Sequence, residues 1–388
     1  VLGNRVGLYD YARIDVSGDA GGGLVLVGGD YQGLGLIPTA VDNYVGPNVS
    51  IFADAVTGGD GGRTIFWADR RTEFFGTIKA RGGRLFGDGG FAEVSGKEEL
   101  YFVGSVDTTA PNGKSGTLLL DPDYITVSGG SGTASASGAS SFTTYEDILE
   151  SVASTTNIEM IATNSITFNN SLSFAQTAGQ SVTFTATNGN ISVTDSSDTI
   201  ETSGGSIIMT AGGTLSIGAV DTNGGDITLT GTEFTLSGAL DAGVGTVTIL
   251  GASGETIGLD GTTASTTAST VSTICNGSAC GLTLIQSELS NITAAKLVIG
   301  DDSAGKMYVD GVTLSHISGG TTLNSSGSNG SVEFGTGDTT IKKVTINAGN
   351  GITVNGDLAT TSTSTFNADY DDSGTGTFTM AAGKALTS

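Results

Sequence analysis

The sequence predicts an all-β protein that folds as a β-solenoid, with one short helix. The first observation is a fixed period of 20 residues, because apolar residues recur at Ile207, Ile227 and Val247. The second is that apolar residues alternate with Thr, Ser or Gly, which is the pattern of a strand with one inward face. The third is the 63 glycines against 4 prolines, which favour many tight turns between short strands. Coils of this kind are stabilised by stacking on their neighbours.

Composition excludes several classes of partner. The net charge is −24, from 39 acidic and 15 basic residues, and no Lys or Arg occurs between Lys114 and Lys296. Such a surface repels phosphate backbones and anionic lipid headgroups. The apolar fraction of 37%, in regular alternation, favours a folded core over a disordered linker. We therefore expect no nucleic-acid partner. No stretch approaches the ~18 consecutive apolar residues of a membrane helix, so we also expect no membrane-spanning segment.

The front third, residues 1–127, is predicted to form longer coils of about 27 residues. Gly61 and Gly89 are 28 residues apart, and Gly89 and Ser115 are 26 apart. The segment from Tyr31 to Pro47 is interpreted as an insertion that loops out of one coil.

Residues 128–155 are predicted to be a joint between two solenoid regions. Ser128 to Ser141 is a low-complexity stretch of Ser, Gly and Ala. Thr143 to Ser154 follows as the helix candidate, with Thr143 and Glu146 spaced as a capping box. Residues 156–388 then resume strand alternation, in coils of about 20 to 25 residues.

The two cysteines, Cys275 and Cys280, lie within the sequence CNGSAC. A turn through Asn276 and Gly277 brings the two sulfurs into bonding range, so a local disulfide in an oxidising compartment is favoured. Two free thiols are the alternative. A metal site through these residues is disfavoured, because His316 is the single histidine of the chain.

Two GDGG turns, Gly59–Gly62 and Gly87–Gly90, are similar to the Gly-rich and Asp-rich turns of calcium-binding β-rolls. The full nonapeptide repeat is absent, and calcium needs six or more oxygen ligands. Turn formation is therefore the favoured role. The candidate calcium ligands are Asp54, Asp60, Asp69 and Asp88.

Acidic clusters raise the alternative of a polysaccharide-degrading enzyme, since glycoside hydrolysis uses paired carboxylates. The clusters are Asp121 with Asp123, Asp301 with Asp302, and Asp369 with Asp371 and Asp372. Each lies in a Gly, Pro or Ser context that indicates an outward turn, and the middle of the chain offers no Arg or Lys to face the acids. We expect no catalytic residues.

The densest aromatic group is Phe66, Trp67, Phe74 and Phe75. Adjacent residues of a strand face opposite ways, so one of each pair is expected to point outward. An exposed Trp67 or Phe75 is a candidate contact for a glycan or a neighbouring subunit.

The front third resembles a known family. The matching text is GNRVGLYDYARIDVSGDAGGGLVLVGGDYQG, YVGPNVSIFADA, GDGGRTIFWAD, GDGGFAEVSGK and DTTAPNGKSGTLLLDPDYITV. These motifs, in this order, resemble the haemagglutinin-repeat exoproteins of two-partner secretion, typified by filamentous haemagglutinin. The resemblance implies a right-handed parallel β-helix, export through an outer-membrane partner, and a location outside or on the surface of a Gram-negative bacterium.

The expected function is a non-enzymatic, structural and adhesive segment of a large secreted surface exoprotein. The chain begins at Val1 within the repeat pattern, so we expect a piece of something longer. Unpaired strand edges predict self-association into fibres, and surface glycans of a host or neighbouring cell are expected ligands. No cofactor is expected, with calcium left open. The alternatives are a glycan-binding module and a polysaccharide-degrading β-helix enzyme.

Overall fold

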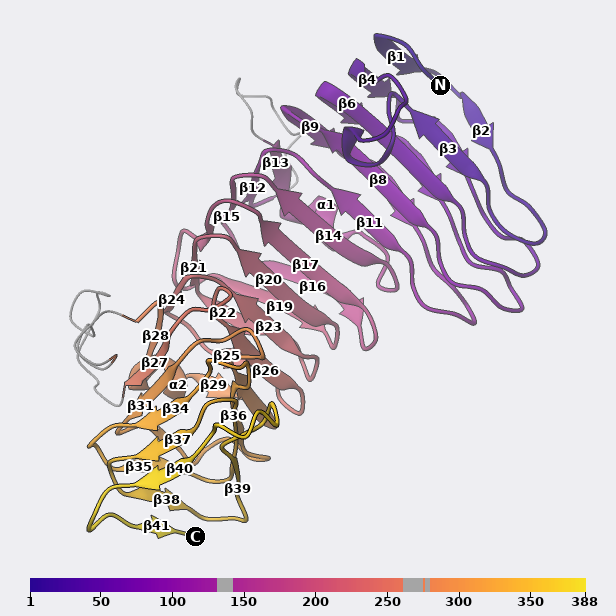
Figure 1. Ribbon diagram of the computed structural model, residues 1–388. Coiled ribbons are helices and arrows are strands. Elements are labelled where there is room, and N and C mark those ends of the chain that lie inside the picture. The colour runs from indigo at the N-terminus through magenta and orange to yellow at the C-terminus, as the bar shows by residue number, and fades with distance from the viewer. Residues whose placement is uncertain (131–141, 261–274, 276–279) are drawn as a thin grey trace. The chain divides into compact units, whose positions relative to one another are not determined.

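The computed structural model describes residues 1–130, 142–260, 275 and 280–388. Within this part the regular elements are short strands, apart from two α-helices and one 3₁₀ turn. Successive coils pair through parallel strands in repeating register (Figure 1). The prediction of a parallel β-helix is confirmed. The chain divides into two compact units, Val1–Ile208 and Met209–Ser388, which are described separately below.

The first unit winds as stacked coils whose strands line up in several sheets. The first sheet contains β1 (Arg5–Leu8), β4 (Ala40–Val45), β6 (Arg63–Phe74), β8 (Phe91–Gly96), β11 (Thr117–Leu120), β14 (Asn157–Ala162) and β17 (Ser181–Ala186), and β3 (Leu24–Val27) and β9 (Glu99–Phe102) pair with β6. A second contains β2 (Arg13–Asp15), β5 (Ser50–Phe52), β7 (Thr77–Lys79) and β10 (Ser105–Asp107). Later coils place β12 (Tyr124–Ser128), β13 (Phe142–Tyr145), β15 (Ser165–Phe168) and β18 (Ile191–Val193) side by side, and pair β16 (Leu172–Thr177) with β19 (Thr199–Ser203).

The second unit has the same construction. Its longest set of paired strands is β23 (Ile227–Thr230), β26 (Thr246–Leu250), β30 (Lys296–Ile299), β33 (Thr321–Ser325), β36 (Val344–Ala348) and β39 (Thr365–Asn367), and β20 (Ser206–Ala211) lies where the chain divides. Two further sets are β21 (Thr214–Ile217) with β24 (Glu233–Leu236), and β22 (Ala219–Asp221), β25 (Leu240–Asp241) and β29 (Ile292–Thr293). The last two sets are β27 (Ile257–Asp260), β28 (Leu282–Ile285), β31 (Met307–Asp310), β34 (Val332–Phe334), β37 (Ile352–Val354) and β40 (Phe378–Met380), and β32 (Thr313–Leu314), β35 (Thr339–Ile341), β38 (Leu358–Thr360) and β41 (Leu386–Thr387).

The 20-residue period is the register of coil pairing. Ile227 lies opposite Val247 and Leu229 opposite Ile249, and all four side chains are fully buried. Longer coils pair in the front region, where Arg63 lies opposite Phe91 and Phe91 opposite Thr117. Each coil therefore repeats the inward positions of the coil before it, as the alternation predicted.

Aromatic side chains fill the interior of the first unit. The rings of Phe168 and Phe184 pack edge to face with their centroids 5.0 Å apart, and the ring centroid of Phe174 lies 6.0 Å from that of Phe184. Phe74 similarly lies between Phe66 and Phe102. These six side chains are at most 1% exposed. Ring contacts of this geometry add to the stabilisation that comes from burying apolar area.

The helix prediction needs correction. The helix α1 covers only Glu146–Glu150, and Thr143 belongs to β13, where it pairs with Thr126 of β12. The residues predicted to form the first turn of the helix therefore belong to a strand, because they pair in parallel with β12. Glu146 accepts hydrogen bonds from Gly130 and Asn170 instead of capping the helix. Of the low-complexity stretch predicted at Ser128 to Ser141, Ser128 ends β12, and residues 131–141 lie outside the described residues.

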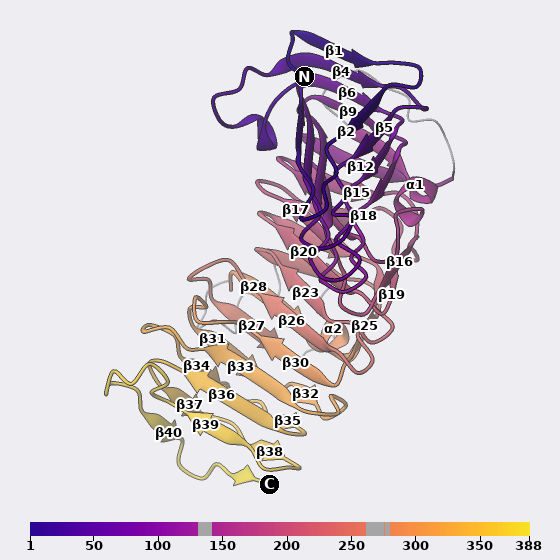
Figure 2. The same cartoon turned by 90° about the vertical axis from the view of Figure 1, so that its right-hand side faces the viewer.

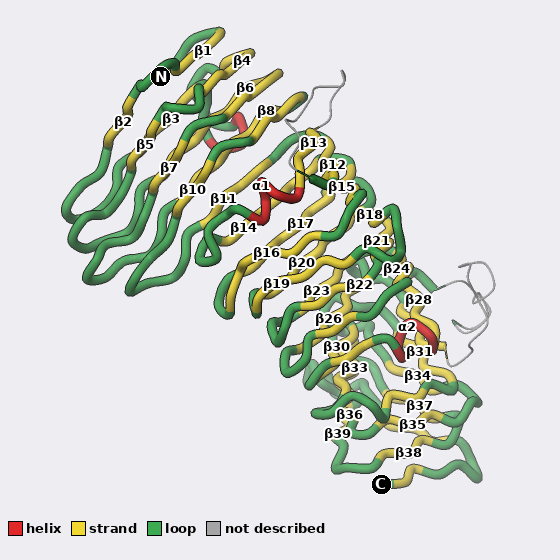
Figure 3. The backbone as a smooth tube through the Cα atoms, turned by 180° about the vertical axis from the view of Figure 1, so that it is seen from behind, coloured by secondary structure: helices red, strands yellow, loops and turns green. Residues whose placement is uncertain are grey.

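A second short helix, α2 (Gln286–Ser290), was not predicted. It follows β28 as α1 follows β13 (Figure 3). In both places the strand stacks on the strand that precedes it in the chain, which is β12 for β13 and β27 for β28. Each helix also hides one leucine, Leu149 or Leu289, which is fully buried. The same strand and helix insertion thus occurs once in each unit. Neither described helix is long and apolar enough to cross a membrane.

Close backbone contact between coils explains some of the glycines. A Cβ atom at Gly89 would lie 1.9 Å from the carbonyl oxygen of Thr108 and 2.4 Å from the amide nitrogen of Gly116. Both contacts are with backbone of the next coil, which cannot move aside without breaking its own pairing. Gly89 is therefore required by coil spacing.

We predict that Gly89→Ala lowers the free energy of unfolding by about 2–3 kcal/mol, because the added methyl group separates two coils. Gly3→Ala is the control, since its Cβ would meet no atom closer than 3.4 Å. Urea unfolding followed by circular dichroism measures both. Equal stability of the two variants would show that coil spacing does not require glycine there.

Candidate functional site

One segment of the first unit leaves the coil path and folds over the outside of the first sheet. The chain departs after β3 and returns at β4, and the amide of Ala40 donates to the carbonyl of Gly28 over 2.6 Å. Because its ends meet, we call the segment Gly28–Ala40 the Ω-loop. It is the indigo loop that stands out from the sheets in Figure 2. The predicted insertion, Tyr31 to Pro47, was too long, because residues 40–45 form β4 and pair with both β1 and β6.

The Ω-loop covers side chains that point away from the core. Ile65 of β6, Glu93 of β8 and Leu119 of β11 lie in one register row, between rows that face inward. All three are nevertheless fully buried. A bare coil would expose this row to water, so its burial depends on a cover from outside the coil.

Gln32 holds the Ω-loop to the first sheet through hydrogen bonds. Its amide nitrogen lies 3.0 and 3.3 Å from the two carboxylate oxygens of Glu93, and its side-chain Nε2 donates to Oδ2 of Asp121 over 2.9 Å. Gln32 has a φ of 52°, a left-handed conformation that is uncommon outside glycine. It belongs to the single 3₁₀ turn of the described residues, η1 (Tyr31–Gly33). One residue thus connects the Ω-loop to carboxylates on two different coils.

Trp67 lies beneath the same loop. Alternation correctly predicted that Trp67 faces out while Phe66 faces in, but the expected exposure is wrong, since Trp67 is only 6% exposed. A Cβ atom on Gly33 would lie 2.5 Å from Trp67 Nε1, so Gly33 allows the loop to lie directly on the indole. Phe75 is half-buried, with its ring 5.9 Å from that of Tyr44.

An open cleft of about 430 Å³ borders the Ω-loop. Its floor is Trp67 and the following coils, and its polar lining carries three carboxylates and one ammonium group, from Asp69, Asp121, Asp123 and Lys97. Asp69 accepts from Trp67 Nε1 at 3.4 Å and from the hydroxyl of Thr39. The cleft therefore combines an aromatic edge with hydrogen-bond acceptors, as in many sites for polar ligands.

Burial perturbs the acids around this cleft. Loss of hydration raises the pKa of Glu93 to about 7, against the hydrogen bond from Gln32, which acts in the opposite direction. Loss of hydration likewise raises the pKa of Asp121 to about 6. Burial also raises the pKa of Glu159, which lies one coil further on, opposite Leu119. The site thus concentrates three carboxyl groups whose pKa is raised by burial.

The tip of the Ω-loop is apolar and open to solvent. Leu34 is 63% exposed and Leu36 is fully exposed. Large apolar side chains displayed together on a projecting loop are typical of interaction surfaces.

The candidate calcium ligands do not come together. Asp60 accepts from the amide of Asp88 over 2.7 Å, and Asp88 accepts from the amide of Lys114 over 2.8 Å, so these two connect successive turns. Asp69 lies at the cleft, and Asp54 belongs to a third place. Among the described residues no group of three or more His, Cys, Asp or Glu side chains is arranged to hold a metal ion.

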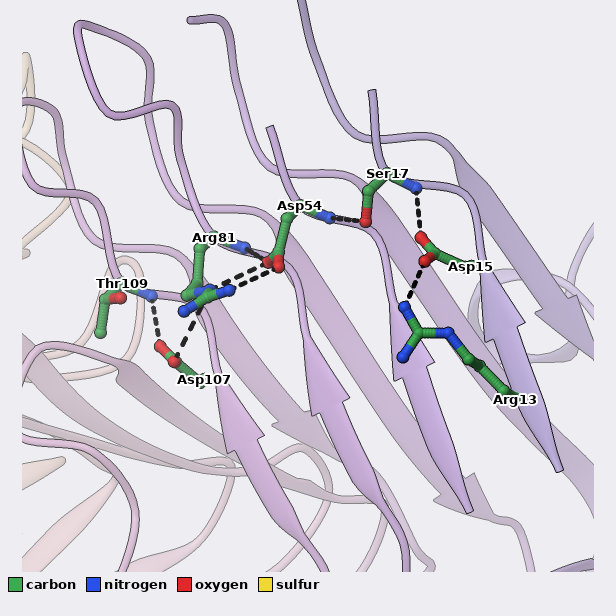
Figure 4. Close-up of polar contacts among 7 residues, drawn as sticks. All are labelled: Arg13, Asp15, Ser17, Asp54, Arg81, Asp107 and Thr109. Carbon is green, nitrogen blue, oxygen red and sulfur yellow. Dashed lines mark hydrogen bonds and ion pairs between the residues drawn. The ribbon is translucent and has the colours of Figure 1, made fainter. Parts of the chain in front are cut away.

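Asp54 forms a ladder with charged groups of neighbouring coils. Its carboxylate accepts from Arg81 Nη2 over 2.7 Å and from Arg81 Nε over 3.1 Å (Figure 4). Arg81 Nε also lies 3.9 Å from Asp107. The hydrogen bond with Asp54 raises the pKa of Arg81. This two-point geometry fixes the register of three coils at their edge.

The remaining predicted clusters are local turns. Asp301 accepts from the amide and hydroxyl of Ser303, and Asp369 accepts from Ser373 and Gly374. Of the acids considered for glycan cleavage, Asp121 and Asp123 are those that line the cleft. Elsewhere, Cys275 and Cys280 form a disulfide with their Cα atoms 5.4 Å apart.

Sequence reasoning missed Gln32 and Glu93. Glu93 occupies an outward strand position that ordinarily faces water, and Gln32 lies 61 residues away from it. The one available signal was the length of the insertion between two strands. No protein-family model matches the chain, and no curated protein matches it in sequence. The class of protein is therefore that defined by the fold, a parallel β-solenoid.

We predict that Asp54→Ala destabilises the first unit by about 1–3 kcal/mol, because it leaves a partly buried Arg81 without its two-point partner. The matched control is Asp15→Ala, which removes an exposed pair with Arg13 and is expected to change stability little. Urea unfolding measures both. A ladder without structural importance would give the same small change in each variant.

Proposed function

We propose that this chain is a non-enzymatic, structural and adhesive segment of a large secreted bacterial surface exoprotein of the filamentous haemagglutinin type. The observation that carries the proposal is a stack of coils in parallel register from which one apolar loop projects. Continuous pairing between coils makes a stiff support. The exposed Leu34 and Leu36 then supply a contact surface held clear of that support.

The proposal includes location and partners. The acidic, lysine-poor composition and the cysteine pair suit an oxidising space outside the cell. The resemblance of the front third supports export through an outer-membrane partner of a Gram-negative bacterium, and contact with surface glycans of another cell. Unpaired strand edges support self-association into fibres, which electron microscopy and light scattering of the purified chain test directly.

Adhesion through the Ω-loop predicts that a double variant, Leu34→Ser with Leu36→Ser, binds cultured cells at least about tenfold more weakly than the unaltered chain, since it removes the apolar anchors. Leu85→Ser is the control, because Leu85 is likewise exposed, at 55%, but lies on another turn. Binding of fluorescently labelled protein, measured by flow cytometry, gives the comparison. Equal binding by the double variant and the control would count against the loop as the contact surface.

A glycan-binding module is the second candidate, favoured by the cleft beside Trp67 and Asp121. It predicts retention of a defined oligosaccharide on an array, reduced by Asp121→Asn. Release of reducing ends from a polysaccharide, abolished by the same substitution, would contradict the non-enzymatic assignment and favour the degrading enzyme.

A further inference from the structure

The Ω-loop closes over two acidic groups, Glu93 and Asp121, that form no ion pair with an Arg or Lys of the described residues. Its latch residue, Gln32, holds Glu93 through its backbone amide and Asp121 through its side-chain amide. Both bonds link the loop to carboxylates that no described salt bridge neutralises. Burying unpaired charge is costly, and a group in this position avoids the cost by taking up a proton.

We propose that the Ω-loop is a proton-controlled strap, which closes over Trp67 and the cleft at acid pH and opens as the pH rises. Opening the strap returns Glu93 and Asp121 to water, where their negative charges are hydrated. Closing the strap removes that hydration and places Gln32 where it hydrogen-bonds to both carboxyl groups. The strap is independent of what the cleft binds, so it does not rest on the proposed adhesive function.

The surrounding charges do not cancel those of the two carboxyl groups. Among the described residues the cations that face them are Arg63, which lies over the rings of Tyr31 and Phe91 at 4.9 and 5.0 Å, and Lys97 of the cleft. Facing acidic groups are the phenol of Tyr31 and the carboxylates of Asp69, Asp123 and Glu159. The negative charge of Asp121 raises the pKa of Glu93, and the positive charge of Arg63 lowers it, each by less than burial does.

The direction of the pH effect follows from proton binding. In the closed state the pKa of Glu93 is raised from 4.5 to about 7 and that of Asp121 from 3.8 to about 6. The closed strap therefore holds more protons than the open strap between about pH 4 and pH 7. The fraction of molecules with a closed strap accordingly falls as the pH rises through this window. Each pKa unit changes the ratio of closed to open about tenfold, so Glu93 alone changes it more than about a hundredfold. Above about pH 7 the ratio of closed to open strap becomes constant, because both carboxyl groups are then ionised in both states.

The loop has the joints that such a movement needs. Gly28, Gly33 and Gly35 have φ values of 75°, 66° and 93°, which glycine adopts without steric cost. The two ends stay together through the bond from Ala40 to Gly28. Opening therefore changes the tip and the latch while β3 and β4 stay in their sheet.

Trp67 reports directly on the strap, because it is the only tryptophan in the chain. We expect acrylamide quenching of its fluorescence to be low at pH 5 and to rise several-fold by about pH 8, as the strap opens. Hydrogen exchange at residues 28–40 gives an independent readout and should quicken over the same pH range by more than the intrinsic chemical rate does.

Variants separate the strap from general effects of pH. Glu93→Gln copies the protonated acid without a titratable group, so its Trp67 should stay shielded across the range, and Asp121→Asn should remove part of the response. Gly33→Ala should raise quenching at every pH, since the new methyl group collides with the indole. Glu98→Gln, which changes an exposed acid of the same coil, should behave as the unaltered chain.

Two results would overturn the proposal. One is equal shielding of Trp67 in the unaltered chain from pH 5 to pH 8, together with increased quenching in Gly33→Ala. The other is an unchanged pH response in both Glu93→Gln and Asp121→Asn. Far-UV circular dichroism at each pH establishes that every variant keeps its strands.

Discussion

Parallel pairing between successive coils is the constraint on which the rest of the structure depends. No coil closes its own backbone hydrogen bonds, so each strand needs the coil before it and the coil after it. This dependence fixes the inward rows, such as Ile227 opposite Val247, and it leaves little room where backbones meet, as at Gly89. It also lets charged groups act between coils, and the contact of Asp54 with Arg81 is the best-defined case.

The same constraint explains why the outer face of the solenoid carries the variable features. Inward positions must repeat to keep the stack, whereas an outward position is free to hold a charge, an aromatic ring or the start of a loop. The Ω-loop uses this freedom, because it leaves the sheet after β3 and returns at β4. The pairing of β3 with β6 is regular, and the pairing of β4 with β6 shifts its register between Ala40 and Asp42, where the loop returns. What lies against it is unusual for a solenoid surface, namely Trp67, which is 6% exposed, and Glu93, which is fully buried.

Much of the fold was predictable from sequence, since a coil repeats its pattern locally. Apolar alternation and the spacing from Ile207 to Val247 identified strands and register without reference to distant residues. The failures involve contacts between distant segments. Trp67 was correctly placed on the outer face, but its cover comes from residues 28–40, and nothing near Glu93 in the sequence indicates that Gln32 lies on it. Thr143 was assigned to a helix because pairing with Thr126 is not visible in a local pattern.

Residue-resolved hydrogen exchange of the intact chain tests most directly whether coil-to-coil pairing holds the structure together. The account predicts that amides in the paired strands of a unit, such as β14 and β17, exchange slowly and at similar rates, while those at the tip of the Ω-loop exchange far faster. Fast exchange within β14 or β17, comparable to that of the loop tip, would contradict the account.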